Sequence, residues 1–371
     1  MSLAGLILGA LLVCQQSDPV AEAGVHLDAG RYAQAVELLK PLAEKNPESV
    51  TIRFNLALAQ SLAGNDGEAI AGFRKALELK PELYEARLNL AQLLVKTGQF
   101  GEASTLLDAC LQTKPEDPKA IYLSGRAAVG QGDLAKAAAA LEKSVTLTPK
   151  DEGLGLELAD LYEKAKQPAK AAEVYGRYPH NAAAQERRGV LLISTGDYPA
   201  AIEALELARK TSPTPAILFA LATAHLRSKH PEAAIPLAAQ LVEAGPGDFD
   251  MRLFYGRLLR DQKRYEEALP QFLAAVKIKP DAGDAWNELT AILLLTKRYE
   301  QGLMTLDKAR ELNGETSAYY YFRATMLDAL KQHKPALESY EKFLSMSQGK
   351  FPDEEFKARE RAKALAKAVR R

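Results

Sequence analysis

The amino-acid sequence predicts an all-α fold, a solenoid of about ten helical hairpins with one capping helix at the C-terminal end. Two observations carry this prediction. Prolines recur in steps of 34 residues at Pro47, Pro81, Pro115 and Pro149, and a glycine-led turn lies between successive prolines. A fixed period of this length indicates stacked units that bury their apolar faces against their neighbours.

Within each period, the residues expected in a helical hairpin stand at fixed distances. The turn glycines, which end a helix cheaply in the left-handed conformation, are Gly30, Gly64, Gly98, Gly132 and Gly196. Small residues for a close helix crossing follow five positions later, at Ala35, Ala69, Ala103, Ala137 and Ala201. One helical turn further are expected core residues, at Leu39, Phe73, Leu107, Leu141 and Leu205. The pattern therefore predicts both helices of each unit.

The register predicts hairpins near 18–47, 50–83, 84–117, 118–151, 152–181, 182–214, 215–248, 249–282, 283–316 and 317–348. The fifth hairpin departs from the period, because Pro149 to Pro213 is four residues short of two units. We therefore expect a shortened second helix there, and a division into two halves, 18–178 and 182–348. A terminal helix over 353–371, with Phe356, Leu365 and Val369 on its apolar side, would cap the array.

Some copies of the repeat are nearly complete. One contains Leu56, Ala57, Gly64, Ala69, Phe73, Ala76 and Pro81, and another contains Tyr255, Gly256, Tyr265, Ala268, Phe272, Ala275 and Pro280. Over residues 18–348 the sequence resembles the tetratricopeptide repeat family, and Trp286 falls at that family's tryptophan position. The resemblance implies a right-handed superhelix of helix-turn-helix hairpins whose first helices line a concave, protein-binding surface.

Composition and motifs argue against other functions. Lysine plus arginine equals aspartate plus glutamate at 48 each, so there is no basic excess to attract nucleic acid. The sequence has no phosphate-binding glycine loop, HExxH motif or nucleophile elbow, and its five histidines are scattered over five hairpins. Cys110 is expected to be a packed helix residue. We expect no enzymatic activity, no cofactor and no metal.

The first seventeen residues form an uncharged, largely apolar segment. Leu3 to Val13 is too short to span a membrane as a helix but suits the apolar region of a bacterial export signal. Residues Leu11 to Cys14 resemble a lipoprotein lipobox, which implies acylation of Cys14, although valine before the cysteine departs from that pattern. We expect a periplasmic or membrane-anchored bacterial protein, with membrane association only through the N-terminus. The alternatives are a cytoplasmic protein and an apolar segment folded on the first hairpin.

The fifth and ninth residues of each hairpin are expected to face the concave surface. They are Phe54, Leu58, Leu88, Gln92, Tyr122, Arg126, Leu156, Asp160, Glu186, Val190, Phe219, Thr223, Leu253, Arg257, Asn287, Ala291, Tyr321 and Thr325. We call this set the first-helix face. Aromatic and arginine side chains on such a surface are suited to anchor a peptide or helix of a partner protein. The alternative for each apolar member is packing between neighbouring helices.

Two further patterns bear on partners. Asn55 and Asn89, with Lys96 and Arg126, partly match the carboxylate clamp of chaperone-binding family members, but the full arrangement is absent. The run Tyr319 to Phe322 cannot bury all four rings on one helix, and Tyr321 is the candidate to contact a ligand. The leading hypothesis is a non-catalytic scaffold binding a partner protein in the cell envelope. The alternative is a cytoplasmic assembly factor or chaperone cofactor.

Overall fold

The computed structural model describes residues 19–369, and every regular element in that range is an α-helix. The helices are α1 (Pro19–Asp28), α2 (Tyr32–Lys45), α3 (Val50–Leu62), α4 (Asp66–Leu79), α5 (Tyr84–Lys96), α6 (Phe100–Thr113), α7 (Pro118–Gln131), α8 (Leu134–Leu147), α9 (Glu152–Lys164), α10 (Pro168–Tyr175), α11 (Ala182–Thr195), α12 (Tyr198–Thr211), α13 (Pro215–Arg227), α14 (Pro231–Ala244), α15 (Phe249–Asp261), α16 (Tyr265–Ile278), α17 (Gly283–Leu295), α18 (Tyr299–Asn313), α19 (Ser317–Ala329), α20 (His333–Ser347) and α21 (Pro352–Val369). The predicted all-α repeat fold is confirmed. Cys14 lies outside the described residues.

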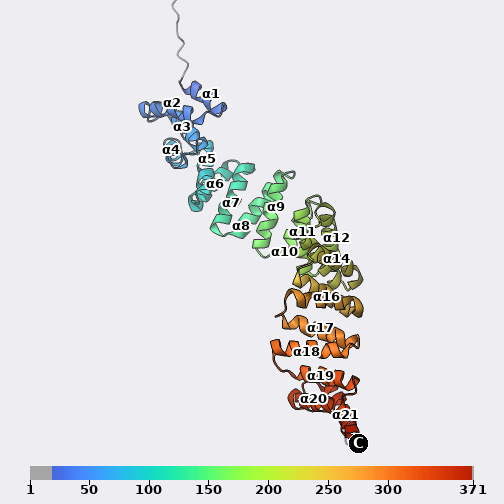
Figure 1. Cartoon of the computed structure of the whole chain (residues 1–371). Coiled ribbons are helices and arrows are strands. Elements are labelled where there is room, and N and C mark those ends of the chain that lie inside the picture. Colours follow the sequence, from blue (N-terminus) through green and yellow to red (C-terminus); the bar gives the residue numbers. More distant parts are fainter. Residues whose placement is uncertain (1–18, 370–371) are drawn as a thin grey trace, which may run out of the picture. The chain divides into compact units, whose positions relative to one another are not determined.

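The hairpins stack in chain order within two compact units, 1–175 and 176–371 (Figure 1). The sequence-based division at 178–182 lies close to this boundary. From α3 onward, the first helix of every hairpin begins at the residue that the 34-residue register predicts. Successive first helices also contact each other directly at α3 with α5, α5 with α7, α11 with α13 and α15 with α17. The first helices therefore form a continuous layer along each unit.

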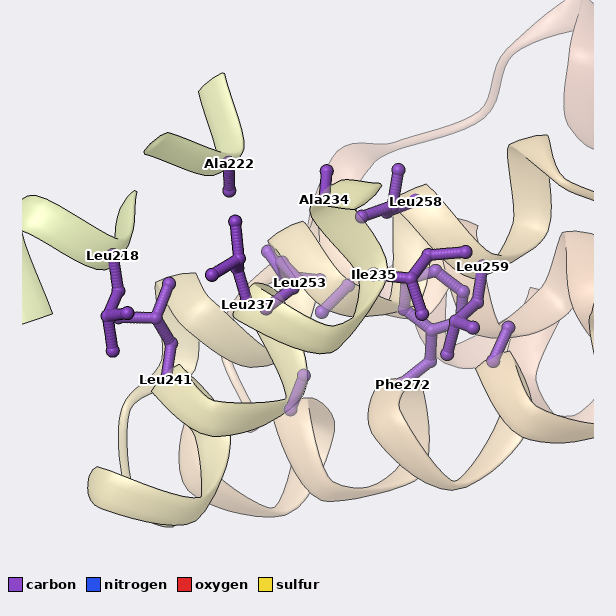
Figure 2. Packing of buried hydrophobic residues seen from close by; sticks show 14 of the residues in the cluster. Leu218, Ala222, Ala234, Ile235, Leu237, Leu241, Leu253, Leu258, Leu259 and Phe272 are labelled. Carbon is purple, nitrogen blue, oxygen red and sulfur yellow. The ribbon is translucent and has the colours of Figure 1, made fainter. Parts of the chain in front are cut away.

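Close helix crossings hold each hairpin together. The five predicted crossing alanines and the five apolar residues one helical turn later all have 0% exposure. In the second unit, Leu259 and Phe272 belong to one cluster that spans several hairpins (Figure 2). Gly256 lies against Phe272, since a Cβ added at Gly256 would stand 2.8 Å from its ring. The predicted seam between hairpins is thus the core.

The turn inside each hairpin adopts the left-handed conformation with two different residue types. The five predicted turn glycines have φ between 71 and 87°. In the other hairpins the same position is a lysine with φ between 56 and 64°, namely Lys166, Lys229, Lys263, Lys297 and Lys331. A side chain in this conformation costs about 1–2 kcal/mol relative to an ordinary backbone geometry. Half of the hairpins therefore contain a strained turn.

The fifth hairpin has the shortened second helix that the sequence predicts. Helix α10 has 8 residues, whereas α8 and α12 have 14. Pro168 begins α10, and Tyr175 ends it with its side chain buried. The Tyr175 hydroxyl donates a 2.8 Å hydrogen bond to Glu163 of α9. This contact ties the end of the short helix to its own hairpin.

The capping helix α21 packs on α20, but not through the predicted stripe. Phe356 and Val369 are exposed, and only Leu365 of the three is buried. The buried face also contains Glu355, which accepts hydrogen bonds from the Gly349 amide at 2.7 Å and from Arg359 at 2.8 Å. Hydrogen bonds from Ser347 and from backbone amides lower the pKa of Glu355. A charged residue was thus taken for a solvent-facing one because its partners lie in the preceding loop.

Other expectations about single residues are confirmed. Cys110 is fully buried in α6, and burial raises the pKa of its thiol. Trp286 packs against the second unit's core and donates a 2.9 Å hydrogen bond from Nε1 to the Pro280 carbonyl. Arg252, at the same position of the preceding hairpin, donates in the same way to Pro246. Across residues 19–369, no helix is both long enough and apolar enough to span a bilayer.

Candidate protein-binding face

The first-helix face begins in α3 with residues that are shared between core and surface. Phe54 is half-buried and meets the fully buried Phe73 edge to face, with ring centroids 5.7 Å apart. Leu58 packs against the same cluster, and Asn55 is half-buried beside them. Phe54 and Leu58 therefore belong in part to the core of the second hairpin, as the packing alternative expects.

Helix α5 presents polar residues to this face. Gln92 is exposed and Asn89 is half-buried. Lys96 forms an ion pair with Asp66 at the start of α4, at 2.7 Å. A clamp for a partner's carboxylate needs cations that are not already paired. Lys96 therefore does not provide one in this conformation, which agrees with the incomplete clamp pattern in the sequence.

Tyr122 and Arg126 of α7 converge on one carboxylate of the next hairpin. Arg126 donates to Glu157 of α9 at 3.0 Å, and the Tyr122 hydroxyl donates to the same carboxylate at 3.2 Å. Burial, and then the charge of Glu157, raise the pKa of Tyr122. Tyr122 and Glu157 line a cleft of about 420 Å³ between the two hairpins. Farther along α9, Asp160 pairs with Lys164 at 2.8 Å.

Arg257 of α15 repeats this arrangement in the second unit. It donates to Glu288 of α17 at 2.7 Å, and Arg260 also pairs with Glu288. The separation along the chain is 31 residues both here and between Arg126 and Glu157. Each pair therefore joins the ninth residue of one hairpin to the sixth residue of the next. The sequence analysis missed both glutamates, although the shared separation could have revealed them.

Asn287 and Tyr321 each line a cleft between elements of the last hairpins. Exposed Asn287 lies at a cleft of about 280 Å³ with Arg310 and Tyr319. Tyr321 lines a separate cleft of about 210 Å³ and meets the buried Phe343 with ring centroids 5.0 Å apart. The aromatic run thus divides as expected, with Tyr319 buried and Tyr321 partly accessible.

Tyr319 and Tyr320 use their hydroxyl groups within the fold. Tyr319 donates to Asp307 at 2.8 Å, and Tyr320 donates to Glu315 at 2.7 Å. Burial, followed by the hydrogen bond to Asp307, raises the pKa of Tyr319 to about 12. These two tyrosines are structural, which leaves Tyr321 and Phe322 to contact a ligand.

The middle of the second unit exposes apolar members of the first-helix face. Val190 of α11 is 50% exposed and Phe219 of α13 is 41% exposed. Phe219 meets Phe254 of α15 edge to face at 5.3 Å. Large apolar side chains exposed at such positions contribute nothing to the local core and are available to a partner.

Titratable groups outside this face do not assemble into a centre. Within residues 19–369, no group of three or more His, Cys, Asp and Glu side chains could hold a metal ion. His225 and His230 lie at either end of a turn, and His230 contacts Ser228 at 3.1 Å. Burial lowers the pKa of His225.

Comparison with protein families gives matches along both units. Two tetratricopeptide repeat models match this chain, one over residues 20–83 and 219–285, the other over 67–127 and 128–191. The chain belongs to the tetratricopeptide repeat family. No curated protein sequence matches it. As a tetratricopeptide repeat protein, the chain is a scaffold for protein–protein interaction.

Solved structures with similar hairpins include MamA from Desulfovibrio magneticus, which is 25% identical with a TM-score of 0.42. The match covers 43% of this chain and 93% of MamA. YrrB, described as a TPR protein with an unusual peptide-binding site, is 22% identical over 53% of this chain and all of its own length, with a TM-score of 0.42. The Naa15/Naa10 complex bound to HypK is 14% identical and covers 88% of this chain and 63% of its own, with a TM-score of 0.47.

Proposed function

We propose that this tetratricopeptide scaffold binds an apolar peptide or helical segment of a partner protein along the first-helix face of its second unit. The observation that carries the proposal is the exposure of Val190 and Phe219 at face positions. A side chain such as Phe219 gains free energy when a partner removes it from water, by about 25 cal/mol per Å² of apolar surface. The repeat framework has no use for this exposure, whereas a binding surface does.

Charged members of the face have a different role. Arg126 and Arg257 pair with carboxylates of the neighbouring hairpin, so a partner would have to compete with those ion pairs to use them. Reversing Arg257 would also place a second carboxylate beside Glu288 and disturb the stacking itself. A test of partner binding is therefore cleaner at the apolar positions.

The test is capture of native partners by the purified full chain, quantified by mass spectrometry, for the wild type and the double variant Val190→Glu/Phe219→Glu. The matched control is Met304→Glu on α18, where the side chain is 74% exposed on a second helix. We expect the double variant to lose at least tenfold of the captured partner and the control to retain it. Equal retention by both variants would refute the proposed face.

The proposal places the protein in the bacterial cell envelope, exported through residues 1–17 and anchored through Cys14. Its support is the uncharged apolar run from Leu3 to Val13 with a cysteine directly after it. Fractionation of native cells, with and without Cys14→Ala, tests this placement. A wild-type protein in the membrane fraction that the variant releases would support acylation. A cytoplasmic protein with an intact N-terminus would refute export.

A further inference from the structure

A small aromatic cleft lies between the last hairpin and the start of the capping helix. It measures about 210 Å³ and is lined by Ala318, Tyr321, Phe322, Phe343, Phe351 and Glu354. Pockets for cofactors and drug-sized ligands measure roughly 300–1,000 Å³. The volume of this cleft therefore suits a single side chain better than a whole small molecule.

The rings are held at angles to one another rather than stacked. Tyr321 meets Phe343 at 5.0 Å with 52° between the ring planes, and meets Phe322 at 6.0 Å with 61°. Phe343 is fixed in the core with 2% exposure, whereas Phe351 at the rim is 42% exposed. Rings arranged in this way present several π-faces to one volume, and π-faces attract cations.

Glu354 gives the cleft one negative charge. It is half-buried, and it forms no ion pair or hydrogen bond with any residue in 19–369. Nearby carboxylates do have cations: Glu355 pairs with Arg359, and Asp328 pairs with Arg361. The position of Glu354 in the first turn of α21 favours its ionised form. The charge of Glu354, after burial, also raises the pKa of Tyr321, which shows that the charge acts within the cleft.

We propose that this cleft receives a basic side chain, lysine or arginine, from a partner protein. The aliphatic stem would lie against Phe343 and Phe351, and the cation would lie between the rings and the Glu354 carboxylate. Charge complementarity selects this occupant, because a neutral apolar side chain would leave a carboxylate desolvated without a partner. The inference rests on the proposed function only in that the partner is a protein, since the cleft does not involve Val190 or Phe219.

The test is an NMR titration of the ¹⁵N-labelled full chain with a blocked alanine pentapeptide that has a central lysine. The comparison peptide has norleucine at the centre, which keeps the four-carbon chain and removes the charge. We expect the lysine peptide to shift the amides of Phe351 and Glu354 and to bind at least fivefold more tightly than the norleucine peptide. Equal shifts from both peptides, or no shift from either, would overturn the proposal.

Two variants separate the cleft from general charge. Glu354→Gln should weaken the lysine peptide at least fivefold, whereas Asp353→Asn removes the same charge from the same helical turn outside the cleft and should leave binding within twofold. Phe351→Ala, at an exposed rim position, should also weaken binding. If Asp353→Asn weakens binding as much as Glu354→Gln, only long-range attraction is present and the site is wrong. Partner capture through Val190 and Phe219 is measured separately, so either proposal can fail alone.

Discussion

Substituting Ala137 by aspartate should unfold its surroundings, whereas the same change two residues later should not. Ala137 has 0% exposure where α7 and α8 cross, and Ala139 lies on the exposed side of α8. The two changes alter the intrinsic helix preference equally, by at most about 0.7 kcal/mol. Any further difference in the free energy of unfolding between Ala137→Asp and Ala139→Asp therefore reports burial at the crossing.

The magnitude follows from placing a carboxylate away from water. Full burial raises the pKa of a carboxyl group by about 3–5 units, which corresponds to about 4–7 kcal/mol. The neutral variant Ala137→Asn has nearly the same shape and should cost only about 1–3 kcal/mol through overpacking. Because the carboxyl pKa in the folded state lies above its unfolded value of about 3.9, the additional cost is absent below pH ~4 and grows as pH rises toward ~8.

Denaturant unfolding followed by far-UV circular dichroism measures the cost. Hydrogen exchange of α7 and α8 locates it, because a repeat array can unfold in parts. The reasoning would be refuted by equal destabilisation in Ala137→Asp and Ala139→Asp. It would also be refuted by a difference between Ala137→Asp and Ala137→Asn that does not change with pH. Ala69→Asp and Ala268→Asp occupy the equivalent position in other hairpins, and their neighbourhoods should unfold in the same way.

Three further outcomes are expected. Glu288→Gln removes the partner of Arg257 and Arg260 and should lower stability by about 1–2 kcal/mol in thermal melts at low salt, a deficit that 1 M NaCl should reduce; a salt-independent deficit would contradict an ionic origin. Lys263→Gly relieves a left-handed turn with φ of 59° and should stabilise the second unit by about 0.5–1 kcal/mol in denaturant unfolding, whereas substitution of Gly98 by lysine should have the opposite effect. The raised pKa of Tyr319, about 12, means that its contribution to stability is complete below pH ~10 and is lost as pH rises through about 12; Tyr319→Phe should remove that loss and one late-titrating phenol from the ultraviolet titration.

The framework could be predicted from the sequence because it recurs in every hairpin. Ala69 and Phe73 are informative only because the same residue types stand 34 residues away, and the structure buries both completely. The lysine turns could not be predicted in this way, because lysine has no intrinsic preference for the left-handed conformation. Lys263 adopts it because the flanking helices fix the backbone on both sides.

Single-copy features were equally hidden. Glu355 is buried because Ser347 and Gly349 lie beside it, and both belong to a loop that occurs once. Phe356 fits a helical stripe by spacing, but its side chain is exposed at 67% because α21 packs on α20 through a different face. A periodic pattern specifies which face of a helix is apolar, whereas the docking of one terminal helix depends on contacts that no period repeats.

The candidate face shows the same division between repeated and single-copy residues. Arg126 and Arg257 occupy the same register position and have the same kind of partner 31 residues away, so their charge acts between hairpins. Val190 and Phe219 have neighbours of their own hairpins behind them and water in front, so their exposure is unexplained by stacking. Residues that stacking already uses cannot also distinguish one partner from another without weakening the array. Recognition therefore has to depend on the positions that differ between hairpins, and in the second unit the most exposed apolar ones on this face are Val190 and Phe219.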